Sequence, residues 1–128
     1  MLNKRFFPIA LMVFLFASIL ATASENPVKS KPVDMPDNVK AIIEKSCFGC
    51  HNTDSKNDKA KEKLDLKTLG DLETPKMIHA FKEINEVLGE NEMPPAKFLE
   101  KFPDKALTEV EKKTLMDWAN SQAKGLMK

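Results

Sequence analysis

Two thiols and an imidazole lie within five consecutive residues, which read Cys47-Phe48-Gly49-Cys50-His51. In an exported protein, the pattern C-x-x-C-H is the attachment sequence of a c-type haem. Two thiols one helical turn apart can add to the two vinyl groups of the porphyrin, and the adjacent imidazole can bind the iron. The sequence therefore predicts one haem c per chain, held covalently through Cys47 and Cys50, with His51 as an axial ligand of its iron.

The cysteine pair has three other interpretations. A thioredoxin-like redox couple belongs beside a βαβ pattern, and no convincing pair of strands flanks the motif. A zinc site would need a better ligand set than His51 and one distant histidine, because the chain has no second C-x-x-C. A structural disulfide would close so short a loop that it would constrain little of the unfolded chain. Haem attachment is the preferred interpretation.

The first 23 residues have the pattern of a secretory signal peptide. Lys4 and Arg5 precede an almost unbroken apolar run over 6–21, and positions 21–23 read Ala-Thr-Ala, as at a cleavage site. The apolar run is shorter than the roughly 20 residues that span a bilayer. We therefore expect a cleaved, periplasmic protein, with membrane association at most through an uncleaved signal segment. Export agrees with the motif, since c-type haem is attached outside the cytoplasmic membrane.

The composition excludes one class of partner. Removal of residues 1–23, which contain two basic and no acidic side chains, leaves 18 Lys plus Arg against 19 Asp plus Glu. Such a balance argues against nucleic acid as a partner. The remaining 105 residues can form one small domain, whose core would be marginal alone. A covalent haem would add a large apolar body to that core.

Apolar spacing predicts an all-α protein. Residues 24–36 contain three prolines and read as a tether, so we expect the folded domain over 37–128. Helices are predicted from an N-cap at Asp37 to the first cysteine, from an N-cap at Thr74 to a stop at Gly89, and from a capping box at Thr108 onward. Between the first two helices, a lysine-rich stretch over 52–63 reads as a solvated face.

Met93 is the strongest candidate for the second axial position of the iron. It lies between two predicted helices in the sequence Glu92-Met93-Pro94-Pro95, where the prolines stiffen the loop that holds the thioether. A methionine within a helix, in a tether or at the chain end is a weaker candidate. Those positions are occupied by Met35, Met77, Met116 and Met127. His79 falls off the apolar stripe of its helix and reads as a surface histidine.

The order of these elements resembles a small monohaem class I cytochrome c. The stretch from Phe81 to Ala119 is closer to the exported bacterial haem-binding domain family, which pairs C-x-x-C-H with E-M-P-P and with a C-terminal L-x-x-E-E-x-x-x-L-x-x-W-A helix. The corresponding elements here are Glu92–Pro95, Leu107–Glu111 and Leu115–Ala119. The resemblance covers roughly Val39 to Ala123. It implies a cytochrome c-like bundle of about three to five helices packed around the haem.

The chain departs from these families in three places. The haem-binding domain family often has an aromatic stretch after the haem motif and a His-Pro pair after M-P-P. This chain has the lysine-rich stretch and Phe102-Pro103 at those positions. Cytochromes c also tend to orient the proximal imidazole with a proline carbonyl, and no proline lies between His51 and Thr74. The hydrogen-bond partner of His51 is therefore not identifiable from the sequence.

The expected function is single-electron transfer between redox partner proteins of unknown identity, and not enzymatic catalysis. His51 is committed to iron, and His79 reads as exposed, so no general acid or base is apparent. Two alternatives stay open. One is a haem protein with an open sixth position that responds to a gas or to peroxide. The other is a haem-carrying accessory module of a larger complex.

Overall fold

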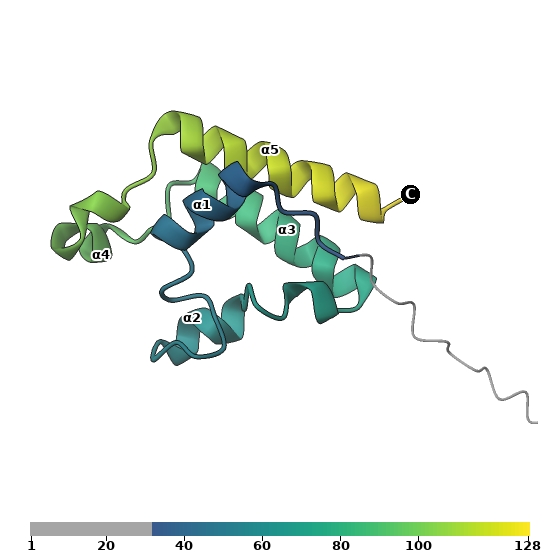
Figure 1. The fold of residues 1–128 in the computed structure, drawn as a ribbon, viewed down its shortest axis with the longest axis horizontal. Helices are drawn as coiled ribbons and strands as arrows, with labels where there is room; N and C mark the ends of the chain where they lie inside the picture. Colours follow the sequence, from purple (N-terminus) through teal and green to yellow (C-terminus); the bar gives the residue numbers. More distant parts are fainter. Residues whose placement is uncertain (1–31) are drawn as a thin grey trace, which may run out of the picture.

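A computed structural model describes residues 32–128, so the expected signal peptide (1–23) and the first part of the tether (24–31) lie outside the described residues. The described chain forms α1 (Asp37–Ser46), α2 (Asp58–Lys63), α3 (Thr74–Gly89), α4 (Ala96–Lys101) and α5 (Glu109–Leu126), with two short 3-10 helices, η1 (Leu69–Asp71) and η2 (Pro103–Lys105) (Figure 1). It contains no strand, which confirms the predicted all-α class and the expected number of helices. None of these helices is long and apolar enough to cross a membrane.

Helices α3 and α5 form the centre of the fold. Phe81 of α3 is fully buried, and its ring meets the indole of Trp118 edge to face, with 5.3 Å between the ring centroids. Asn85 on α3 donates from Nδ2 to the carbonyl of Met116 on α5 at 2.8 Å. The other buried apolar residues of the two helices are Met77, Leu88, Leu115, Ala119 and Ala123.

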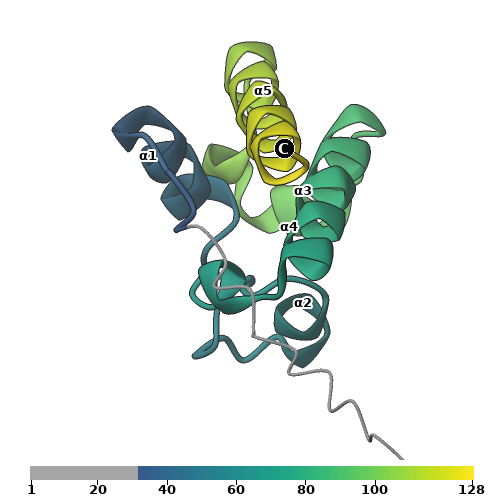
Figure 2. The same ribbon diagram turned by 90° about the vertical axis from the view of Figure 1, so that its right-hand side faces the viewer.

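Helix α1 completes the core from the other side of α5. Figure 2 shows α5 between α1 and α3. Val39 and Ile43 are buried, and they are four residues apart, so they lie on one face of α1. The packing of that face in the core fixes the C-terminal end of α1, which the C-x-x-C-H motif follows directly.

Residues 32–36 have no helix or strand, yet they lie against the core. The indole Nε1 of Trp118 donates to the carbonyl of Asp34 at 2.7 Å. The side chains of Val33 and Met35 are half-buried and pack against the core cluster. The end of the predicted tether is therefore fixed to α5.

Two of the three predicted helix starts need correction. Helix α3 begins at Thr74, but its N-cap is Glu73, so Thr74 is the first helical residue and not the cap. Pro75 then falls in the first turn, where the backbone N–H that proline lacks would have no partner within the helix. Similarly, Asp37 is the first residue of α1 and makes no capping bond. The capping box at Thr108 is confirmed, because its hydroxyl accepts from the Glu111 backbone N–H at 3.1 Å and its own N–H donates to the Glu111 carboxylate at 2.9 Å.

An ion pair joins the end of α1 to the start of α5. Lys45 donates from Nζ to both carboxylate oxygens of Glu111, at 2.7 and 2.6 Å, and to the carbonyl of Ala106 at 3.0 Å. The hydrogen bond from Lys45, supported by the one from the Thr108 backbone, lowers the pKa of the Glu111 carboxyl below its ordinary value of 4.5. A carboxyl whose pKa is lowered on folding stabilises the fold at pH values above its unfolded pKa. That contribution is lost as the pH falls through the folded pKa.

Glu111→Gln is therefore expected to destabilise the protein by about 1 kcal/mol at neutral pH, because it removes the ion pair and weakens the cap. The difference from the wild type should shrink as the pH falls from about 4.5, the ordinary pKa of the carboxyl, through the lowered pKa that it has in the folded state. Denaturant unfolding at several pH values measures this difference. Glu109→Gln is the control, since Glu109 lies in the same helical turn and is exposed. Equal pH dependence of the two variants would contradict the prediction.

Candidate haem site

The C-x-x-C-H motif forms one turn at the end of α1. The backbone N–H of Cys47 donates to the Ile43 carbonyl at 2.8 Å, which continues the hydrogen bonding of the helix. The N–H groups of Cys50 and His51 then both donate to the Cys47 carbonyl, at 3.2 and 3.1 Å. This turn contains both cysteines and the histidine. Both cysteines are free thiols and are half-buried.

The protonation of Cys47 bears on the redox-couple interpretation. Burial, with a smaller contribution from Cys50, raises the pKa of the Cys47 thiol to about 11. Reactive C-x-x-C couples instead need a lowered thiol pKa, since the thiolate is the nucleophile. Cys47 is a neutral thiol at pH 7, which disfavours a thioredoxin-like role.

The imidazole of His51 is oriented by backbone carbonyls. Its Nδ1 lies 3.0 Å from the carbonyl oxygen of Ala60 and 3.1 Å from that of Leu64. A carbonyl can only accept, so these partners assign the ring proton to Nδ1. The other nitrogen, Nε2, then carries a lone pair that can bind a metal. The partner of His51 that the sequence could not identify is thus a pair of main-chain carbonyls.

Helix α2 provides those carbonyls. Ala60 lies within α2, where its carbonyl also accepts from the Leu64 backbone N–H at 3.0 Å, and Leu64 is the C-cap. His51 therefore lies at the C-terminal end of α2. Asn57 is the N-cap of α2, and its side chain accepts from the Ala60 N–H at 3.1 Å. No residue of α2 is buried. Most side chains of α2 are therefore exposed, while the main chain of the helix and its C-cap holds the histidine.

The candidate axial ligands away from the motif differ in their access to the surface. Met93 lies in the loop between α3 and α4 and is 36% exposed. Met77, by contrast, is fully buried in the core. His79 is exposed on α3, with its Nε2 3.9 Å from a carboxylate oxygen of Glu83. Phe102, at the position of the family's His-Pro pair, is 47% exposed and lies with its ring centroid 5.0 Å from that of Phe98.

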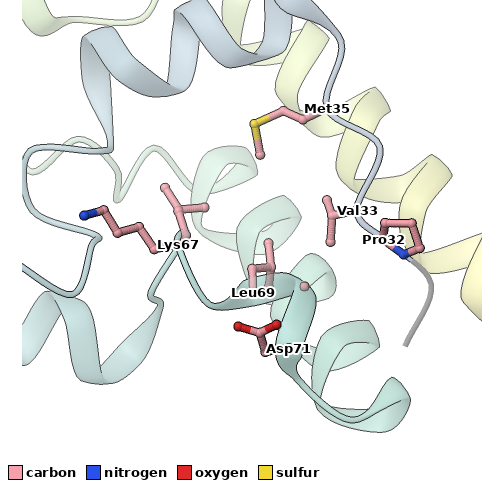
Figure 3. A pocket seen from close by; sticks show the side chains of 8 residues that line it. Pro32, Val33, Met35, Lys67, Leu69 and Asp71 are labelled. Carbon is pink, nitrogen blue, oxygen red and sulfur yellow. The ribbon is translucent and has the colours of Figure 1, made fainter. Parts of the chain in front are cut away.

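A groove of about 610 Å³ is lined by residues from 32–35 and 66–71 and by none of the motif. Figure 3 shows the side chains of Val33, Met35 and Leu69 directed into this groove. Leu66, which also lines it, donates from its backbone N–H to the His51 carbonyl at 3.1 Å. The groove is therefore linked to the main chain of His51 through Leu66, and the thioether of Met35 is on its wall.

The donor set of the motif fits a haem. It consists of two free thiols on one turn and an imidazole with its tautomer fixed. A porphyrin also needs apolar side chains around it. Three such residues within or near the motif are half-buried and pack against the core: Phe48, Leu64 and Leu66. In the part of the chain that the structure describes, no group of three or more His, Cys, Asp or Glu side chains could hold a bare metal ion.

Comparison with known proteins gives one match. A profile of the haem-binding domain family matches residues 54–121, just over half of the 128 residues. The match begins after the C-x-x-C-H motif and includes Met93 and Trp118. A search of curated proteins and a search of solved structures each found no match. Because the match covers more than half of the chain, the chain belongs to the haem-binding domain family.

Proposed function

We propose that the protein is a periplasmic c-type cytochrome that transfers single electrons through one haem, held covalently by Cys47 and Cys50. The observation that carries this proposal is the orientation of His51, whose Nδ1 is held by two carbonyls so that Nε2 is left to bind iron. When bound, haem supplies an iron that exchanges one electron between its ferric and ferrous states.

The protein's contribution lies in its ligands and their surroundings. Hydrogen bonds to the Nδ1 proton of a ligating imidazole fix the ring and raise its basicity. At the end of α2, the Ala60 and Leu64 carbonyls have that role. Half-buried apolar groups such as Phe48 and Leu64 lower the local dielectric, which also affects the reduction potential.

Met93 is the proposed second axial ligand. Its loop joins α3 to α4, and the two prolines that follow it restrict the backbone. A thioether is a neutral, soft ligand, and a His/Met ligand pair raises the reduction potential of haem. Such a pair leaves no open position on the iron, so we propose electron transfer between partner proteins and no catalysis.

Spectroelectrochemistry of the exported, haem-loaded protein tests this function. We expect one reversible one-electron transition, low-spin spectra in both states, and the weak near-infrared band of methionine-to-iron charge transfer in the oxidised state. Carbon monoxide should bind the reduced protein slowly at neutral pH, because Met93 must first dissociate. Rapid binding, with a five-coordinate reduced iron, would instead support the gas- or peroxide-responsive alternative. Stoichiometric co-purification with a larger membrane complex would support the accessory-module alternative.

A further inference from the structure

Two buried polar side chains bond back to the haem motif. Asn52 is 8% exposed and Ser55 is 9% exposed, and both follow His51 within four residues. A buried polar group is costly unless it is hydrogen-bonded, so such residues usually fix a particular local structure. The proposed function assigns no role to either residue.

Asn52 connects the two sides of His51. Its Nδ2 donates to the carbonyl of Phe48, within the motif, and its Oδ1 accepts from the backbone N–H of Asp54 at 2.8 Å. One end of this amide is used as a donor and the other as an acceptor. An aspartate could not replace it at neutral pH, because a carboxylate has no donor for the Phe48 carbonyl.

Ser55 connects the motif to α2. Its hydroxyl donates to the Gly49 carbonyl at 3.3 Å and accepts from the Asn57 backbone N–H at 3.1 Å. Asn57 in turn is the N-cap of α2. Lys61 adds a bond from within α2, since its Nζ donates to the Ser55 carbonyl at 3.2 Å.

These bonds form a closed path. The motif bonds to Asn52 and Ser55, Ser55 bonds to the start of α2, and the end of α2 bonds to Nδ1 of His51. Helix α2 itself buries no side chain, and its apolar packing is limited to the half-buried Leu64 at its C-cap. The start of α2 is therefore joined to the motif by the polar path.

We propose that Asn52 and Ser55 are positioning residues that hold the motif and α2 in the arrangement in which His51 faces the iron. This inference rests on the proposed function, since it concerns the same haem. Loss of either side chain should let α2 move and lengthen the bonds to Nδ1. A weaker bond to Nδ1 makes the imidazole less electron-rich and stabilises ferric iron less, so the reduction potential should rise.

The test compares haem-loaded Asn52→Ala and Ser55→Ala with Asn85→Ala. Asn85 is a matched control, because it also donates from Nδ2 to a backbone carbonyl, at 2.8 Å, but between α3 and α5. All three variants should lose stability. Only the first two should raise the potential and speed the solvent exchange of the His51 Nδ1 proton, by about tenfold if about 1.4 kcal/mol of protection is lost. NMR of the oxidised protein measures the exchange rate of that proton.

The outcomes separate the two proposals. Equal exchange rates and potentials in all three haem-loaded variants would overturn the positioning role and leave the cytochrome function intact. If Asn52→Ala and Ser55→Ala fail to retain covalent haem while Asn85→Ala retains it, the result supports the positioning role, because attachment itself then depends on the path. Absence of covalent haem from the wild-type protein would overturn the proposed function, and this inference with it.

Discussion

The variant with both Cys47→Ala and Cys50→Ala is expected to retain no haem after denaturation, whereas the wild type should retain one haem per chain. The two thiols lie on a single turn next to an oriented imidazole, which is the arrangement that forms two thioether bonds to one porphyrin. Acid acetone extraction separates covalent from non-covalent haem. A reduced pyridine spectrum typical of two thioether links identifies the wild-type adduct.

A neighbouring residue provides the control for the cysteine variant. Ser46 precedes the motif, and its hydroxyl is buried with no hydrogen-bond partner in the described structure, so Ser46→Ala should leave attachment unchanged. The cysteine variant should also lose most helical circular dichroism and its cooperative melting, since a domain this small would lack the apolar body around which its helices pack. Haem that acid acetone extracts from the wild type, or zinc bound in its place, would refute covalent attachment.

The long helices were predictable because they carry both periodicity and end signals. The apolar positions of α3 repeat at helical spacing up to Gly89, where the helix ends. The capping box of α5 specifies its start through two bonds that are both present. The cap of α3 was less predictable, since the unpaired N–H groups of a first turn accommodate proline at either of two positions.

The two short helices left no such signal. Helix α4 (Ala96–Lys101) and helix α2 (Asp58–Lys63) each have six residues and bury none, so no apolar periodicity marks them. The contribution of α2 to the site comes from main-chain carbonyls, which are the same for every residue type. A sequence pattern therefore could not identify the partner of His51, although it proposed the histidine and both cysteines as candidate haem-binding residues.

The roles of Asn52 and Ser55 were hidden for a related reason. Polar residues in a lysine-rich stretch indicate solvent exposure, and most of that stretch is exposed. Only the three-dimensional structure shows that these two side chains turn inward toward the Phe48 and Gly49 carbonyls. A prediction of solvent exposure from the composition of a stretch describes its average residue and cannot single out two buried ones.

Met93→Ala is expected to change the iron more than any other methionine substitution. Removal of the thioether should convert the oxidised iron to a high-spin or water-ligated form, abolish the near-infrared band and lower the reduction potential, because methionine ligation favours the ferrous state. Since Met93 is 36% exposed, the loss of packing should be small. Absorption spectroscopy and redox titration measure the two effects, and denaturant unfolding measures stability.

Met77→Ala should have the opposite profile. Met77 is fully buried in the core, so its truncation should cost about 2–5 kcal/mol of stability and leave the spectrum and potential close to those of the wild type. The two variants together separate ligation from packing, because each change affects one property and spares the other. An unchanged spectrum and potential in Met93→Ala would exclude it as the ligand. Met35, on the wall of the groove, and then His79 would be the next residues to substitute, since neither side chain is fully buried as that of Met77 is.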